Sequence, residues 1–153
     1  MGFTTLSLKG RALRLLSQRE HSRAELQRKL KPHVQEGEDL AALLDDLQAR
    51  DFISETRVVE SVLNLRASRL GASRIRQELH AKGIDPDTVQ QALTALKDTE
   101  WARAYAVWQR KFGAVAEDPQ QRAKQVRFLV TRGFPSEITW RVVRGEAPEG
   151  EEP

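Results

Sequence analysis

The apolar positions of this chain recur with the period of an α-helix. Leu40, Leu43, Leu44 and Leu47 would share one helix face, and similar groups follow along the sequence. No window alternates apolar and polar residues with the period of two that a half-buried strand requires. The pattern predicts an all-α protein with nine helices, at roughly 8–19, 23–31, 38–50, 55–69, 73–82, 86–97, 99–112, 119–131 and 136–144.

Residues that start helices stand before several of these segments. Ser22 and Glu25 have the spacing of a capping box, in which the hydroxyl accepts from a first-turn amide while the carboxylate reaches back. Asp85-Pro86 and Asp118-Pro119 each place an acceptor at the cap and a proline at the first helical position, where its missing N–H costs nothing.

Residues that stop helices stand after other segments. Pro32 is expected to end the helix that begins near Ser22, because a proline inside a helix costs about 3 kcal/mol. Gly71, Gly83 and Gly133 lie where a residue in the left-handed conformation would terminate a helix.

The chain carries a weak internal repeat. Segments 25–29, 78–82 and 128–132 each end in a basic residue, at spacings of 53 and 50 residues, and glycine follows the last two. A unit of about 50 residues has room for three helices. We therefore predict three tandem three-helix repeats in an elongated array, at 8–50, 55–97 and 99–144, followed by a disordered acidic tail at 145–153.

An aromatic row lies in the third repeat. Trp101, Tyr105, Trp108 and Phe112 step along one helix face, a spacing that favours a place in the core. The alternative is a stacking platform for nucleic-acid bases. Trp140 is one position off the apolar face of its helix, so we expect it to be partly exposed.

The composition argues against catalysis. There is no cysteine, and the three histidines share no helix face at metal-ligand spacing, so neither a thiol nucleophile nor a metal site is expected. No glycine-rich phosphate loop occurs. Adjacent Asp45 and Asp46 would point apart on a helix and could not share a proton. We predict a binding protein without cofactor, not an enzyme. No apolar run is long enough to span a membrane and no signal peptide is visible, which favours the cytoplasm.

Charge is distributed in blocks of alternating sign. The net charge is only +3, but segments 1–33, 62–84 and 101–134 are basic and the segments between them are acidic. This alternation favours a basic face built from three separate segments. The alternative is a set of solvated helices with mixed charge.

The middle helix of each predicted repeat is its most basic element. The basic face is therefore assigned to Arg23, Arg28, Lys29, Arg66, Arg69, Arg74, Arg76, Lys82, Arg122, Lys124, Arg127 and Arg132. Arg66, Arg69, Arg74 and Arg76 form its densest part. Either phosphates or an acidic protein groove would suit such a face. The alternative is that the arginine stems only cover the apolar stripe while their heads stay hydrated.

Three segments resemble the RecX family of bacterial regulators of the recombinase RecA. They are Arg19-Glu20-His21-Ser22-Arg23-Ala24-Glu25-Leu26, Gly71-Ala72-Ser73-Arg74-Ile75-Arg76-Gln77-Glu78-Leu79 with Lys82-Gly83-Ile84, and Phe128-Leu129 with Arg132-Gly133-Phe134. The resemblance spans about residues 8–144. One departure is the run Ser54-Glu55-Thr56-Arg57-Val58-Val59, where the family often has an acidic segment.

The resemblance implies a curved body that binds along the groove of the RecA–single-stranded DNA filament. It further implies inhibition of the filament's ATPase, strand exchange and co-protease action on the LexA repressor, in recombination, DNA repair and the SOS response. The expected partner is thus the RecA filament, with single- or double-stranded DNA as a second partner, and the chain is expected to be a monomer. The alternative function is independent DNA binding through the basic face.

Overall fold

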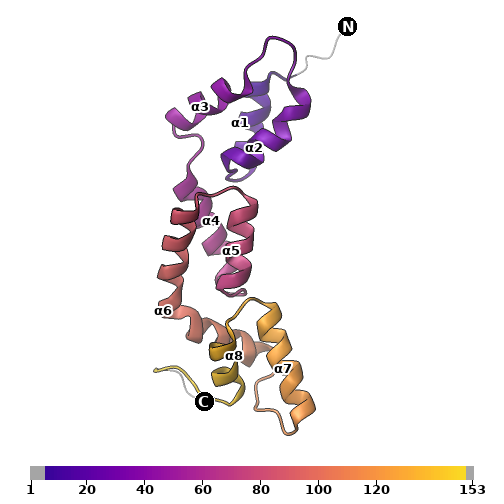
Figure 1. The fold of residues 1–153 in the computed structure, drawn as a ribbon, viewed down its shortest axis with the longest axis vertical. Coiled ribbons are helices and arrows are strands. Elements are labelled where there is room, and N and C mark those ends of the chain that lie inside the picture. Colours follow the sequence, from indigo (N-terminus) through magenta and orange to yellow (C-terminus); the bar gives the residue numbers. More distant parts are fainter. Residues whose placement is uncertain (1–5, 151–153) are drawn as a thin grey trace. The chain divides into compact units, whose positions relative to one another are not determined.

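The computed structural model describes residues 6–150 and is all-helical over that range, as predicted (Figure 1). It contains eight α-helices, one short 3₁₀-helix and no strand in the described part of the chain. The α-helices are α1 (Leu8–Gln18), α2 (Arg23–Leu30), α3 (Leu40–Ala49), α4 (Glu55–Arg66), α5 (Ala72–Ala81), α6 (Pro86–Lys111), α7 (Pro119–Thr131) and α8 (Ser136–Val143), and the 3₁₀-helix is η1 (Lys31–His33).

The prediction of separate helices at 86–97 and 99–112 is wrong, because α6 runs unbroken through both segments. Neither glycine nor proline follows Pro86 within α6, so nothing in the backbone chemistry interrupts it. Thr99 remains helical and its hydroxyl donates to the Leu96 carbonyl at 3.3 Å. The second and third repeats therefore share one long helix.

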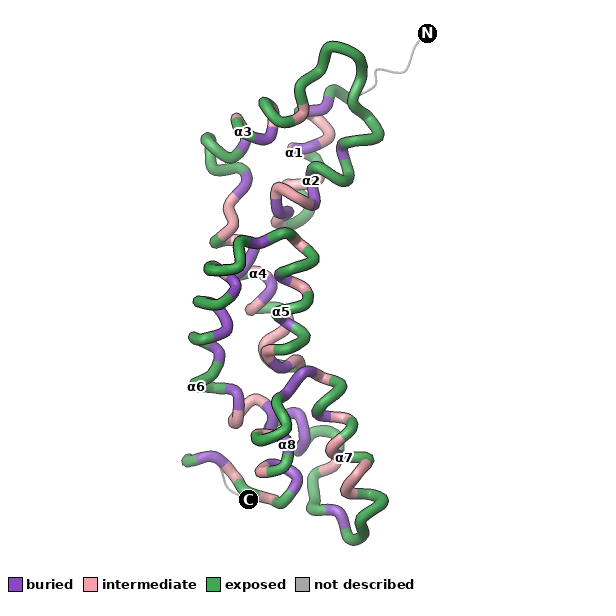
Figure 2. The backbone as a smooth tube through the Cα atoms, in the orientation of Figure 1, coloured by how far each residue is buried: buried purple, intermediate pink, exposed green. Residues whose placement is uncertain are grey.

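The chain forms two compact units. Unit 1 comprises Met1–Ser61 with Ala81–Ile84, and unit 2 comprises Val62–His80 with Asp85–Pro153. Purple segments in Figure 2 mark the buried residues of each unit. The core of unit 1 comes from α1, α2, α3 and the turn after α3: Leu8, Ala12, Leu26, Leu30, Leu44, Leu47 and Ile53.

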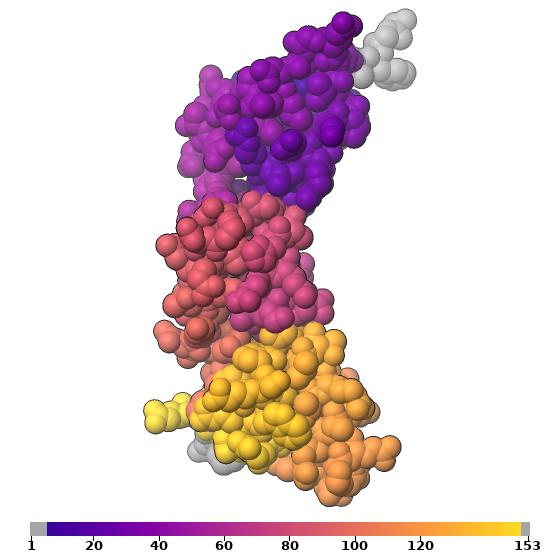
Figure 3. Space-filling model, viewed as in Figure 1, coloured from indigo at the N-terminus to yellow at the C-terminus, as the bar shows by residue number. Residues whose placement is uncertain are grey.

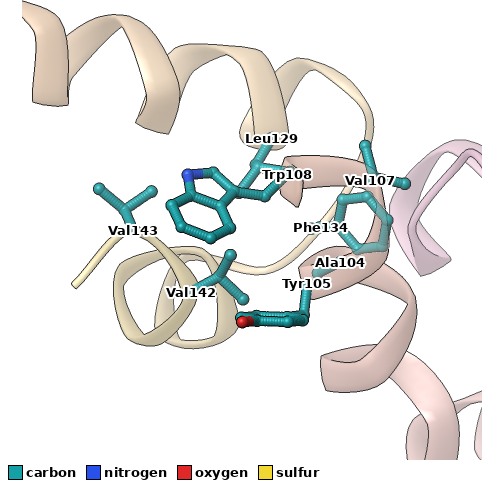
Figure 4. Packing of buried hydrophobic residues seen from close by; sticks show 8 residues of the cluster. All are labelled: Ala104, Tyr105, Val107, Trp108, Leu129, Phe134, Val142 and Val143. Atoms are coloured by element: carbon teal, nitrogen blue, oxygen red, sulfur yellow. The ribbon is translucent and has the colours of Figure 1, made fainter. Parts of the chain in front are cut away.

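The aromatic row of α6 belongs to the core of unit 2, as predicted. Tyr105 and Trp108 are buried against Leu129, Phe134 and residues of α8 (Figure 4). Trp101 and Phe112 are partly buried and pack against this cluster. The indole N–H of Trp108 donates to the buried Gln125 amide oxygen at 2.9 Å. In the space-filling view the side chains of α7 and α8 form a continuous surface (Figure 3). Trp140 is 44% exposed, also as predicted.

The predicted helix starts are confirmed. Ser22 and Glu25 form the full capping box of α2. Asp85 accepts from amides of the first turn of α6, and Asp118 accepts from the Gln121 amide. Gly83 and Gly133 have positive φ angles of 72° and 96°, the left-handed conformation predicted for them.

Gly71 serves a different purpose from the one predicted, since it is not among the glycines with positive φ. A Cβ at Gly71 would lie 2.4 Å from backbone atoms of Gly133 and Phe134. The Gly71 amide donates to the Arg132 carbonyl at 2.8 Å and the Ser73 amide to the Gly133 carbonyl at 3.2 Å. The turn between α7 and α8 thus lies directly on the start of α5, and only glycine permits the approach.

The turn after α5 makes the same kind of contact in unit 1. A Cβ at Gly83 would lie 2.7 Å from the Ala24 Cβ at the start of α2. Lys82 donates to Glu25 at 3.2 Å, and Arg28 donates to the Ala81 carbonyl at 3.2 Å. A glycine turn on a helix start is therefore the recurring joint of the fold.

The helices revise the register of the repeat. Leu26 and Leu30 are buried at the fourth and eighth positions of α2, and Ile75 and Leu79 at the same positions of α5. Leu26 thus corresponds to Ile75, 49 residues later, rather than to Leu79 at the predicted spacing of 53. A shift of four residues keeps the same helix face, so the apolar pattern could not distinguish the two registers.

The start of the predicted disordered tail is packed against unit 2. The Trp101 indole N–H donates to the Glu146 carbonyl at 3.3 Å, and Ala147 lies against the aromatic core. The prediction of disorder therefore does not hold for this stretch. Residues 151–153 lie outside the described part of the chain.

We expect Gly71→Ala to lower the free energy of unfolding by about 2 kcal/mol, because the added methyl group would push the α7–α8 turn from the start of α5. Urea unfolding followed by circular dichroism measures the effect. Ser73→Ala, at an exposed neighbouring position, is the control and should change the free energy by less than about 0.5 kcal/mol. Equal stability of Gly71→Ala and the wild type would contradict the role assigned to this contact.

Candidate functional site

Several of the predicted basic-face residues form ion pairs within the protein. Arg23 pairs with Asp45 at 2.7 Å, Arg66 with Glu78 at 3.0 Å and Lys82 with Glu25 at 3.2 Å. Part of the positive charge of these side chains is therefore neutralised within the protein. The assignment of the whole basic face to partner binding stays a prediction.

The four arginines of the densest predicted cluster make different contacts. Arg66 forms an ion pair with Glu78, and Arg74 donates to the Thr131 carbonyl at 3.1 Å. Arg76 lies exposed on α5, while Arg69 lies in a hollow with other basic side chains. On α7, Lys124 and Arg127 are exposed and Arg122 is half-buried.

Glu25 is the buried centre of a charge network in unit 1. It is 6% exposed and accepts from Arg19 at 2.7 Å, from the Ser22 amide at 3.0 Å and from Lys82 at 3.2 Å. Burial by itself raises the pKa of this carboxyl, but the hydrogen bonds from Arg19 and Ser22 and the charge of Lys82 outweigh it and lower the pKa from 4.5 to about 2. Glu25 is therefore a structural anion that holds Lys82 in place.

His21 is a buried neutral imidazole beside this network. Its Nδ1 lies 3.0 Å from the Arg19 carbonyl and its Nε2 lies 3.0 Å from the Lys29 ammonium. Nδ1 therefore carries the proton and donates to the carbonyl, while Nε2 accepts from Lys29. Burial is the main cause that lowers the pKa of His21, and the neighbouring cations add to it.

Arg103 is a buried cation that the sequence reasoning did not single out. Its side chain is 13% exposed and donates to the carbonyls of Ala67, Leu70 and Leu96 at 2.9–3.1 Å. Burial lowers the pKa of its guanidinium, and nearby Glu100 partly opposes this. Glu100 in turn accepts from the Ala72 amide at 3.1 Å. Arg103 therefore satisfies backbone carbonyls just after the end of α4. Little of its side chain is exposed to bind a partner.

Arg57 has a similar structural role in unit 1. It donates to Glu20 at 2.8 Å, to the Asp51 carboxylate at 3.0 Å and to the Asp51 carbonyl at 2.6 Å. The hydrogen bond to Glu20 is the main cause that raises the pKa of Arg57. Asp51 has a positive φ of 65°, so this clamp stabilises a backbone conformation that aspartate adopts at some cost. Within the run that departs from the family pattern, Arg57 thus serves the fold.

Unit 2 presents a basic hollow of about 240 Å³, called here the third-repeat groove. It is lined by Arg69, Val107, Arg110, Lys111, Phe128 and Arg132. The Arg132 guanidinium lies 4.7 Å and the Lys111 ammonium 5.6 Å from the centre of the Phe128 ring. None of the four cations forms an ion pair with a carboxylate among residues 6–150.

Two cations of this groove, Arg110 and Lys111, were not predicted as site residues. They close the last turn of α6, where the helix dipole favours positive charge. That pair of adjacent basic residues at a helix end was the available signal. It was not used because the middle helices carry more charge.

Unit 1 presents a second basic hollow of about 310 Å³, called here the first-repeat groove. Its basic residues are Arg11 and Arg14 of α1, Lys29 of α2 and His33 of η1, and its apolar walls include Leu15 and Leu30. In the described part of the chain, no carboxylate pairs with any of these four side chains. Only Lys29 was predicted here.

Residues 6–150 contain no group of three or more histidine, aspartate or glutamate side chains placed to hold a metal ion. Within the same range no helix combines the length and apolar character that crossing a bilayer needs. The arrangement can bind anions and apolar side chains.

The comparisons with known proteins agree over most of the chain. Family models described as the first, second and third three-helix domains of RecX match residues 9–47, 54–93 and 98–143. The chain is 53% identical over 139 residues to a regulatory protein RecX from Leptothrix cholodnii, covering 91% of this chain and 88% of that one. It is 57% identical over 129 residues to a regulatory protein RecX from Herminiimonas arsenicoxydans, covering 84% and 85%.

A solved structure shares the fold. The crystal structure of RecX from Lactobacillus salivarius matches with a TM-score of 0.75 at 20% identity, covering 91% of this chain and 94% of that chain. At that identity the likeness shows the fold alone.

We expect Glu25→Gln to lower the free energy of unfolding at pH 7 by about 3 kcal/mol, the linkage value of a pKa shift from 4.5 to about 2. Because the folded pKa is the lower one, the stabilisation is complete above about pH 4.5 and is lost as the pH falls towards 2. Urea unfolding of both proteins at pH 7, 4 and 3 should show the difference narrowing on acidification. The exposed Glu36→Gln variant is the control, and a difference that does not change with pH would contradict the network described.

Proposed function

Because the chain belongs to the RecX family of regulatory proteins, with all three of its three-helix domains matched, we propose that it regulates the RecA recombinase. It binds along the groove of the RecA–single-stranded DNA filament and lowers the filament's ATPase, strand exchange and LexA co-protease activities. It acts as a monomer in the cytoplasm, in recombination, DNA repair and the SOS response.

The observation that carries this proposal is the match of three successive family domains over residues 9–143. The chemistry of the surface supports it. Each unit carries a groove that combines cations without internal ion pairs and apolar walls, features that suit a protein surface with exposed carboxylates.

A second candidate function is DNA binding without RecA. The observation in its favour is the convergence of Arg69, Arg110, Lys111 and Arg132 on one hollow, because guanidinium groups bind phosphates through paired hydrogen bonds. Against it, both cations near the Phe128 ring cover a surface on which a base would stack.

A RecA ATPase titration tests the first function. The protein is added to RecA before filament assembly and, separately, to filaments already formed on single-stranded DNA. ATP hydrolysis should fall at stoichiometric or lower ratios of this protein to RecA. The order of addition separates a block on filament growth from disassembly of existing filaments. Unchanged hydrolysis at saturation in both arms would refute the proposal.

A salt titration tests the second function. Labelled oligonucleotides are mixed with the protein in the absence of RecA and followed by fluorescence anisotropy. Direct binding to duplex DNA should weaken with salt at a log–log slope of about −0.9 for each phosphate contacted. Binding that is absent at low salt would remove the second function and leave the first intact.

A further inference from the structure

The first-repeat and third-repeat grooves occupy the same place in their repeats. Each lies between the first and second helices: α1 and α2 in one case, the second half of α6 and α7 in the other. The buried leucines Leu30 and Leu129 define the register. Lys29 and Phe128 immediately precede these leucines, while His33 and Arg132 follow each by three positions. Corresponding positions therefore line both hollows.

The second repeat fills the corresponding place with its own side chains. Its buried leucine is Leu79, and Glu78 stands where Lys29 and Phe128 stand in the other repeats. Glu78 accepts from Arg66 of α4 at 3.0 Å, which joins the first and second helices of this repeat by an ion pair. Lys82, at the position of His33 and Arg132, is bound to Glu25. At these positions the second repeat therefore carries charges that are paired within the protein, whereas the outer repeats present theirs in a groove.

The lining of the two grooves selects among anionic ligands. Both combine cations with apolar walls, from Leu15 and Leu30 in one and from Val107 and Phe128 in the other. A carboxylate next to an apolar side chain meets both features. A nucleotide fits less well, because the first-repeat groove contains no Phe, Tyr or Trp and the Phe128 ring lies under Arg132 and Lys111.

We propose that the two grooves are equivalent docking sites for a protein segment that carries a carboxylate beside an apolar residue. A partner built from identical subunits presents such a segment repeatedly, so one chain engages two copies of it. The inference rests on the proposed function, whose filament is such a partner. Joining two sites in one chain raises affinity by about 10²–10⁴-fold over one site alone.

Charge-reversed variants of each groove test the proposal. Arg11→Glu with Arg14→Glu alters the first-repeat groove, Arg69→Glu with Lys111→Glu alters the third-repeat groove, and a third variant carries all four changes. Matched controls reverse the same number of charges on exposed residues that do not line the grooves. They are Lys9→Glu with Lys31→Glu in unit 1 and Lys97→Glu with Arg144→Glu in unit 2.

Binding is measured by fluorescence anisotropy of the labelled full chain on RecA filaments formed on single-stranded DNA with a slowly hydrolysed ATP analogue. Each groove variant should lose about 100-fold in affinity, to similar final values, since each then binds through one site. The combined variant should fall further, while the controls stay within about threefold of the wild type. Circular dichroism checks that every variant remains helical, and the glutamine versions replace any that does not.

The outcomes separate the hypotheses. Groove variants that bind like their controls overturn the proposal. A loss confined to one groove overturns the equivalence of the two sites. If free single-stranded DNA binding falls by the same factor as filament binding, the ligand is the phosphate backbone and the protein segment is refuted. Failure of the wild type to bind the filament refutes the proposed function instead, which the wild-type arm alone detects.

Discussion

The constraint on which unit 2 depends is the contact of two backbones at Gly71 and Gly133. The first amides of a helix have no partners within that helix. At the start of α5 the Ala72 amide donates to the Glu100 carboxylate and the Ser73 amide to the Gly133 carbonyl, while the preceding Gly71 amide donates to the Arg132 carbonyl. No side chain fits between the two glycines, so the α7–α8 turn has one position on α5. Unit 1 makes the corresponding joint around the Gly83 turn with a buried carboxylate. Glu25 accepts hydrogen bonds there from the Ser22 amide and from the Arg19 and Lys82 side chains.

These joints also decide which charges remain available to a partner. A buried carboxylate is stable only with cations beside it. Glu25 therefore pairs with Arg19 and Lys82, and Glu100 lies beside the buried Arg103. Among the cations that lie away from these carboxylates are those that line the first- and third-repeat grooves. The balance between charges used for folding and charges left for binding therefore differs from one repeat to the next, although the helices are the same.

The sequence alone was sufficient for most of the fold, because helix caps and apolar spacing are local signals. The capping box of Ser22, the Asp-Pro starts and the left-handed Gly83 and Gly133 all follow from neighbours in the chain. Gly71 was misassigned because its requirement comes from a segment about 60 residues away. The groove residues Arg110 and Arg14 were missed for a related reason. Charge density along one helix does not show whether a carboxylate from another helix neutralises it, as Glu78 does for Arg66.

The continuity of α6 has a consequence for how the protein unfolds. A chain of independent repeats can lose its end repeat alone, since each repeat contacts only its neighbours. Here one 26-residue helix contributes Leu93 and Leu96 to one end of unit 2 and Tyr105 and Trp108 to the other. Unfolding of the third repeat would remove the residues that pack against the second half of α6. Because the first half of α6 belongs to the second repeat, the two repeats are expected to unfold as one cooperative block. Hydrogen exchange of α6 amides should then report a single opening free energy along its buried length.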